Sequence, residues 1–221
     1  NARLLSREQV RALLAAVLQE GTLVGLRDLA FFLARFSLGV RLKELQALRW
    51  DQIERDADGV WVRWERDGER RPLPGLVWQA LEFYLQAAGR LEGLRDEDYI
   101  FAPPVDVLRG AVDGRAEEWD ATRFLSADRW NAVLKKYGRR AGLPDDLLTL
   151  PALRHTAVTL RLAAGDDPEQ LRAFLGDRLL EVTKNYVRAL PQPGEEGPRP
   201  PASPESRPLW PDLSLAGGGS A

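Results

Sequence analysis

The sequence is divided into short helices by capping residues and glycines, and this pattern restricts the fold more than any other feature. Apolar residues recur at three- and four-residue spacing between these signals, which is typical of amphipathic helices packed on a shared core. Ser6 with Gln9 forms a capping box, and Gly39 ends a more uniformly apolar helix that we expect to be buried. The predicted helices start after Ser6 and then cover 23–38, 44–48, 76–88, the segment between Ser126 and Gly142, 151–164, 168–175 and 179–186.

A single segment alternates with period two. Apolar residues occupy every second position from Val60 to Trp64, and the two-residue turn signal Asp67-Gly68 follows. The pattern predicts a β-hairpin across 59–73. The expected fold class is therefore mainly α with a small antiparallel β-hairpin or sheet (α+β).

The composition changes after Leu190. Eight of the 15 prolines fall between Pro191 and Pro211, which predicts one domain at 1–190 and a proline-rich tail or linker at 191–221. Within the tail, 209–215 is a short apolar island around Trp210. We expect it to dock into an apolar groove, in cis or in trans; the alternative is a disordered terminus.

The composition also excludes several chemistries. The chain has no Cys and only one His, His155, so thiolate zinc sites, cysteine nucleophiles and His-pair metal sites are ruled out. We expect no metal and no small-molecule cofactor. No run of about 18 apolar residues and no signal peptide is present, so the expected location is cytoplasmic, without a membrane partner. The formal net charge of −2 argues mildly against a general nucleic-acid binder.

Three segments carry the functional signal. The first is 39–45 with 48–53, the second is 153–156, and the third is 175–177 followed by Thr183 and Tyr186. Their order and spacing resemble the catalytic domain of the tyrosine recombinases, the phage integrase family. The resemblance extends over about 5–190 and includes the opening helix, the hairpin and the helix at Trp130.

The resemblance implies a role for each matching residue. Tyr186 would attack a DNA phosphodiester and form a 3′-phosphotyrosyl link. Arg41 and Arg154 would bind the non-bridging oxygens, because a guanidinium fits phosphate geometry and stays charged. Glu44 would hold Arg41 in place. Without the surrounding match, Arg41 and Glu44 would be ordinary helix-end charges and Tyr186 a tyrosine at the edge of the core.

Three positions depart from the family pattern. Pro151 stands where the family has a histidine base, and Asp177 where it has His or Trp. The hairpin lacks the family's lysine acid, and Arg66 is the nearest substitute. A guanidinium is a poor proton donor but a useful charge. His155 is either a packed, hydrogen-bonded histidine or a base, and the family's Arg-His pair favours the first interpretation.

A basic group lies on the helix after Ser126. Phosphate contacts and a solvated helix face both explain such a group. Its members are Lys135, Lys136, Arg139 and Arg140.

The leading hypothesis is the DNA-binding catalytic domain of a tyrosine recombinase that acts in DNA integration or recombination, with slow or impaired cleavage. Duplex DNA is the expected partner, with a homo-oligomer assembling on it, and the family's N-terminal core-binding domain is not in this sequence. One alternative is a relative that binds DNA but has lost strand cleavage, which covalent trapping on nicked DNA would separate. Another is a protein-interaction module, favoured by the acidic pI and the tail, for which DNA binding would be absent at every salt concentration.

Overall fold

The computed structural model describes residues 4–66, 68–105, 118–167 and 171, which form a mainly helical fold with one small sheet. The predicted fold class is confirmed. The predicted helices at 168–175 and 179–186, with Asp177 and Tyr186, lie outside the described residues, except that Leu171 is described. The tail at 191–221, with its segment 209–215, also lies outside them.

The described elements follow the predicted order. The α-helices are α1 (Arg7–Leu18), α2 (Leu23–Leu38), α3 (Leu42–Gln46), α4 (Gly75–Ala87), α6 (Ala127–Arg140) and α7 (Leu150–Ala163). Short 3₁₀ helices are η1 (Trp50–Gln52), η2 (Leu91–Gly93) and η3 (Asp145–Leu147). The strands are β1 (Ile53–Asp56), β2 (Gly59–Arg63) and β3 (Arg70–Pro72).

Capping residues set the helix ends, as the sequence predicts. The Ser6 hydroxyl accepts the Gln9 N–H at 3.2 Å, and the Gln9 side-chain oxygen accepts the Ser6 N–H at 2.9 Å. Gly39 closes α2 in the left-handed region, with φ of 59°, where glycine has no Cβ penalty. The predicted helix at 44–48 instead spans Leu42–Gln46, because its N-cap is Arg41.

The sheet contains one strand more than the sequence predicts. It is antiparallel in the order β1-β2-β3, and Ile53 of β1 pairs with Val62 of β2. The four residues of β1 include three charged ones and no alternation, so period two does not reveal this strand. A side-chain oxygen of Asp56 accepts the backbone N–H of Asp58 and the indole N–H of Trp61, which fixes the turn into β2.

The connection after β2 is longer than the predicted two-residue turn. Strand β2 ends at Arg63 and β3 begins at Arg70. The Trp64 N–H donates to the Glu69 carbonyl at 3.1 Å, and the Gly68 N–H donates to the Trp64 carbonyl at 2.9 Å. The loop between the strands carries Arg66 toward α3. A two-residue turn would have left Arg66 in the strand.

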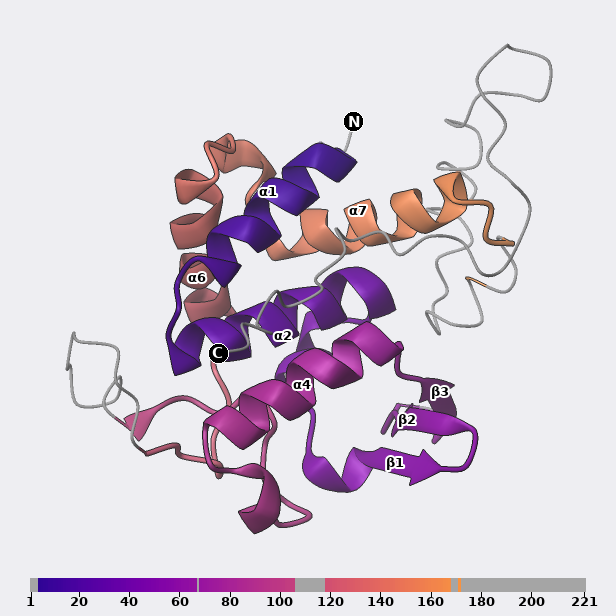
Figure 1. Ribbon diagram of the computed structural model, residues 1–221. Helices are drawn as coiled ribbons and strands as arrows, with labels where there is room; N and C mark the ends of the chain where they lie inside the picture. The colour runs from indigo at the N-terminus through magenta and orange to yellow at the C-terminus, as the bar shows by residue number, and fades with distance from the viewer. Residues whose placement is uncertain (1–3, 67, 106–117, 168–170, 172–221) are drawn as a thin grey trace, which may run out of the picture.

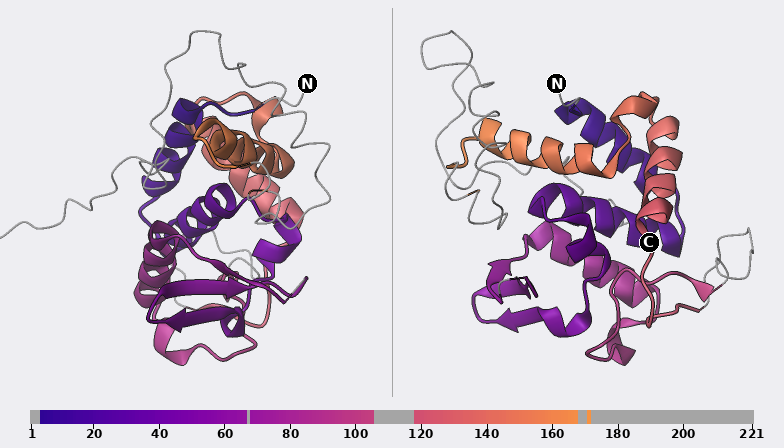
Figure 2. Two further views of the ribbon diagram at one scale, coloured as in Figure 1. Left: turned by 90° about the vertical axis from the view of Figure 1, so that its right-hand side faces the viewer. Right: turned by 180° about the vertical axis from the view of Figure 1, so that it is seen from behind.

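Helix α2 lies at the centre of the fold (Figures 1 and 2). Helices α1 and α7 lie on one side of it, and α4 with the sheet lies on the other. It packs directly against α1, α4 and α7. Its three charged residues, Arg27, Asp28 and Arg35, are all buried. No helix in the described ranges is long and apolar enough to cross a membrane.

Aromatic residues fill the core between α2 and α6. The Trp130 ring stacks on Phe31, with centroids 3.5 Å apart and planes 7° apart, and meets Phe32 and Phe101 edge to face. Tyr137 donates its hydroxyl to the Asp28 carboxylate at 3.0 Å. Arg27 pairs with the same carboxylate at 2.6 Å, so this buried charge is compensated.

Gly138 is required by close packing rather than by its backbone conformation. A Cβ at this position of α6 would lie 2.3 Å from a terminal methyl carbon of Leu148, which is fully buried. We expect Gly138→Ala to lower the free energy of unfolding. Overpacking costs about 1–3 kcal/mol, which outweighs the gain of about 1 kcal/mol in helix propensity.

Denaturant unfolding measures this difference. Gly75→Ala in the first turn of α4 is the matched control, because nothing lies within 4 Å of a Cβ there. A Gly138→Ala protein as stable as the wild type would contradict the packing explanation.

Candidate active site

Arg41 lies where α2 ends and α3 begins. It is the N-cap residue of α3, and its backbone N–H donates to Oε2 of Glu44 at 2.8 Å. A carboxylate in the first turn also favours the positive end of the helix. The Arg41 side chain is exposed. Glu44 therefore fixes the backbone that carries Arg41.

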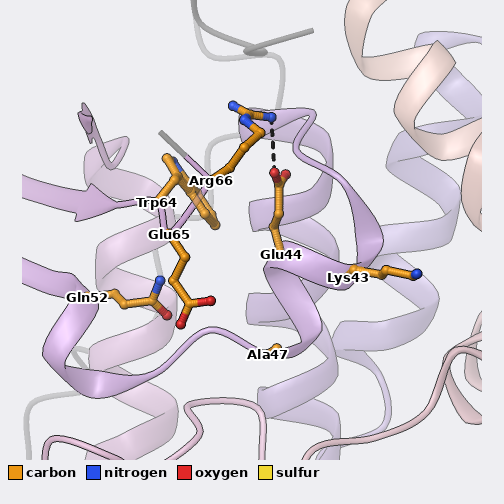
Figure 3. Close-up of a pocket in the computed structure, with 7 residues that line it drawn as sticks. All are labelled: Lys43, Glu44, Ala47, Gln52, Trp64, Glu65 and Arg66. Carbon is orange, nitrogen blue, oxygen red and sulfur yellow. Dashed lines mark ion pairs between the residues drawn. The ribbon is translucent and has the colours of Figure 1, made fainter. Parts of the chain in front are cut away.

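Glu44 also holds the hairpin loop. Its Oε1 pairs with Nη1 of Arg66 at 3.0 Å, and both side chains are largely buried (Figure 3). One carboxylate thus bonds the start of α3 with one oxygen and the loop between β2 and β3 with the other. Glu44 thus contacts the Arg41 backbone and the Arg66 side chain, and its role in holding the Arg41 side chain stays a prediction.

A cavity of about 390 Å³ lies between α3 and the hairpin. In Figure 3, the paired Glu44 and Arg66 side chains point toward each other, whereas Lys43 points away from this pair. Glu65 adds a second carboxylate, so the lining is not uniformly basic. Neither Arg41 nor Arg154 lines the cavity, which lies on the hairpin side of Glu44. The lining residues are Lys43, Glu44, Ala47, Gln52, Trp64, Glu65 and Arg66.

Arg154 belongs to α7 and is buried, with 9% of its surface exposed. Pro151 lies one turn earlier, in the first turn of this helix, and is exposed. A proline fits there because the N–H groups of the first turn have no partner within the helix. The structure therefore explains Pro151 as a helix-start residue that cannot exchange a proton.

Arg35 connects the Arg41 and Arg154 segments, although it lies outside the three motif segments. From the last turn of α2, its Nη1 donates to the Val40 carbonyl and its Nη2 donates to the Leu150 carbonyl at 2.9 Å. A charged residue within a helix predicted to be buried was the available signal in the sequence. Arg154 lies close enough that its charge, after burial, contributes to lowering the pKa of Arg35.

The structure thus brings two groups of predicted residues to the junction of α2, α3 and α7. Glu44, Arg66 and the Arg41 backbone form one group, and Arg154 with His155 forms the other. Besides burial, which lowers the pKa of Arg35 most, the charge of Arg154 lowers this pKa and the charge of Glu44 raises it. Tyr186 and Asp177 lie outside the described residues, so their predicted places in the site stay predictions.

The basic group of α6 is largely paired within the protein. Lys136 and Arg140 both pair with Glu20, which follows α1, the first at 2.6 Å. Arg139 pairs with Asp145 of η3 at 2.7 Å. Phosphate binding by these three residues would require an exchange of partners. For Lys135, the fourth member, the DNA-binding role is likewise still a prediction.

A metal site is not formed by the residues that the structure describes. Within these ranges, no group of three or more His, Cys, Asp or Glu side chains is placed to hold an ion.

His155 is expected to be neutral near pH 7. Its partial burial, followed by the charges of Arg154 and Arg35, lowers the pKa of the imidazole from its ordinary 6.5. A lowered pKa in the folded state means that the unfolded chain binds the proton more readily. The contribution to stability is therefore present above pH 6.5 and is lost as the pH falls through the folded-state pKa.

Urea unfolding between about pH 8 and pH 5 tests this dependence. The wild type should lose stability relative to His155→Gln as the pH falls, and carboxylates common to both proteins cancel in the comparison. Parallel curves for the two proteins would show that the His155 pKa is not lowered by folding.

Solved structures with the same arrangement of helices and sheet are recombinases. The XerA recombinase crystal structure matches with a TM-score of 0.61 at 22% identity, over 84% of this chain and 58% of that one. The XerH site-specific recombinase bound to its difH substrate matches with a TM-score of 0.63 at 16% identity, over 83% and 49%. The fold of this chain is therefore the one that these recombinase structures share.

The chain belongs to the phage integrase family, whose model matches residues 3–192. Tyrosine recombinase XerD of Xanthomonas campestris pv. campestris is 32% identical over 186 residues, which are 83% of this chain and 54% of that protein. Tyrosine recombinase XerA of Thermococcus onnurineus is 28% identical over 186 residues, 83% of this chain and 57% of that protein. The chain spans about half the length of these curated relatives. The resemblance found in the motifs is confirmed.

Proposed function

We propose that this chain is the catalytic part of a tyrosine recombinase that binds duplex DNA in the cytoplasm and acts in DNA integration or recombination. The observation that carries the proposal is the meeting of the Arg41 and Arg154 segments at one junction, with Arg35 bonded to both. Two guanidinium groups from different elements suit the non-bridging oxygens of one phosphate. Two structural relatives, XerH and the Tn1549 transposon integrase, are recombinases in complex with DNA, which supports DNA as the partner.

In the proposed reaction, the Tyr186 phenol oxygen attacks the phosphorus of a DNA phosphodiester. A P–O bond to Tyr186 forms, and the bond to the 5′-oxygen breaks. The phenol proton passes to water, because Pro151 cannot accept it, and the 5′-oxygen takes a proton from water. Arg41 and Arg154 stabilise the added negative charge of the transition state. Arg66 adds charge at the hairpin loop without donating a proton.

Covalent trapping tests this function. The protein is incubated with a duplex that carries its recombination site and a nick, so that the released fragment diffuses away. We expect a protein–DNA adduct that forms slowly and is absent from Tyr186→Phe. Arg154→Met should also abolish the adduct, whereas Arg95→Met, an exposed arginine after η2 that belongs to no predicted site, should leave it intact. An adduct that persists in Tyr186→Phe would contradict the assignment of the nucleophile.

A DNA-binding relative without strand cleavage is the second candidate. The exposed proline at residue 151 and the arginine at residue 66 favour it, because neither side chain moves a proton readily. DNA binding that weakens with rising salt, together with no adduct on the nicked substrate, would establish this alternative. A chain that binds no DNA at low salt would exclude both candidates.

Assembly of several copies on one DNA site is part of the proposal. Another structural relative, matched with a TM-score of 0.52, is a lambda integrase dimer bound to a core site. Sedimentation of this chain with and without a duplex carrying two half-sites measures the assembly directly. A complex with only one copy per duplex would remove this part of the proposal.

A further inference from the structure

We propose that Arg35 is a positioning residue of this site, which holds the Arg41 and Arg154 segments together and adds its charge to their attraction for an anion. The part that concerns the anion rests on the proposed function. The positioning part rests on the contacts of Arg35 alone. Arg35 itself touches no substrate in this proposal, because it is 2% exposed.

The first observation is where the two guanidinium bonds go. Val40, which accepts from Nη1, is the residue before Arg41. Leu150, which accepts from Nη2, lies one helical turn before Arg154. The two Nη groups of a planar guanidinium diverge in a fixed geometry, so one side chain bonds both carbonyls at once. The spacing between the two segments is therefore set by the width of one guanidinium.

The second observation is the charge of Arg35. Arg27, on the same helix, is equally buried but pairs with Asp28. Among the described residues, no carboxylate forms an ion pair with Arg35, and its Nε is buried without a hydrogen-bond partner. Burial lowers the pKa of Arg35 to about 9, so it is still a cation near pH 7.

A buried cation without a carboxylate partner is costly, whereas methionine or leucine would fill similar space at little cost. The carbonyls of Val40 and Leu150 satisfy hydrogen bonds of Arg35 but do not neutralise its charge. An anion held by Arg41 and Arg154 would compensate that charge. Such an arrangement is typical of a site prepared for an anion before it binds.

Three variants separate the contributions. Arg35→Met removes both the charge and the two bonds. Arg35→Lys keeps the charge, but one ammonium lacks the planar fork that bonds both carbonyls. Arg90→Met is the matched control, because Arg90 is also buried and donates to two carbonyls, those of Tyr99 at 2.7 Å and Ile100 at 2.8 Å.

The first measurement is the melting temperature in inorganic phosphate, compared with sodium chloride of equal ionic strength. We expect phosphate to raise the melting temperature of the wild type and of Arg90→Met. In Arg35→Met, the apparent affinity for phosphate should fall about tenfold, because the buried charge and the fixed spacing of the two segments are both lost. Arg35→Lys should fall in between, because the charge persists but the two segments are no longer held together.

The second measurement is the titration of His155 by proton NMR, which is unambiguous because the chain has a single histidine. Arg35→Met should raise the His155 pKa toward its ordinary value, whereas Arg90→Met should leave it unchanged. If Arg35→Met does not fold, Arg35→Lys carries the comparison, with an unchanged His155 pKa and a weaker phosphate response.

Where phosphate stabilises the wild type, the proposal is overturned if the Arg35 variant and Arg90→Met respond alike to phosphate, or if Arg35→Met folds and leaves the His155 titration unchanged. If phosphate does not stabilise even the wild type, the phosphate site of the proposed function fails. In that case, the His155 titration of Arg35→Met tests the positioning role. Loss of folding in both Arg35 variants, but not in Arg90→Met, would support this role. The two failures are therefore distinguishable.

Discussion

Pro151→His is expected to raise the rate of covalent adduct formation by about 10²–10⁴-fold, the usual contribution of a positioned proton-transfer group. Pro151 is exposed in the first turn of α7, one turn before Arg154. Histidine fits this backbone, because a first-turn N–H needs no partner within the helix. The motif resemblance implies that the family has a histidine base at this position. The substitution would therefore restore an acceptor for the phenol proton of Tyr186.

Single-turnover trapping on the nicked duplex measures the rate. Pro151→Asn is the matched control, because it removes the proline and adds a polar group that cannot accept the proton. Pro151→His combined with Tyr186→Phe must give no adduct. If Pro151→Asn accelerates the reaction as much as Pro151→His, the effect comes from the backbone and not from proton transfer.

The second large effect is on stability. Trp130→Ala is expected to lower the free energy of unfolding by about 3–5 kcal/mol, the cost of removing a large buried aromatic side chain. Trp130 is completely buried and contacts three phenylalanines contributed by α2 and the segment after η2. The Arg27 guanidinium also lies 5.3 Å from the centre of the Trp130 ring. The cavity left by the substitution would therefore open the contact between α2 and α6.

Chemical denaturation with two comparison variants tests the cause. Trp130→Phe should be much less damaging, because the indole N–H is buried without a hydrogen-bond partner and its removal forfeits no bond. Trp61→Ala, on the partly exposed face of β2, should also cost far less. Equal losses for Trp130→Ala and Trp61→Ala would show that the aromatic cluster does not dominate the core.

The helices could be predicted because their limits are local. Ser6, Gly39 and Ser126 fix helix ends through bonds or dihedral angles within a few residues, and apolar spacing supplies the buried faces. Strand β1 could not be predicted, because it forms only when Ile53 pairs with Val62 of β2. The length of the loop that carries Arg66 could not be predicted either. The Trp64 N–H donates to the carbonyl of Glu69, which lies beyond the Asp67-Gly68 turn signal.

Within the candidate site, contacts between residues close together in the chain could be predicted from the sequence. Glu44 lies three residues after Arg41, the spacing at which a side chain in the first turn of a helix accepts the backbone N–H of the N-cap residue. Arg35 could not be assigned a role, because its two acceptors, the carbonyls of Val40 and Leu150, lie 5 and 115 residues after it in the chain. Similarly, the partner of Lys136 is Glu20, and a sequence separation of 116 residues hides that pairing.

Because Glu44 already pairs with Arg66, an anion that binds Arg66 would have to replace the Glu44 carboxylate. An incoming phosphate that approaches Nη1 of Arg66 meets a carboxylate already bound at 3.0 Å. The other carboxylate oxygen stays bonded to the Arg41 N–H, so α3 keeps its first turn when Arg66 leaves. Under the proposed function, a DNA phosphate bound by Arg66 would therefore displace Glu44 from Arg66 while Glu44 keeps its bond to the start of α3.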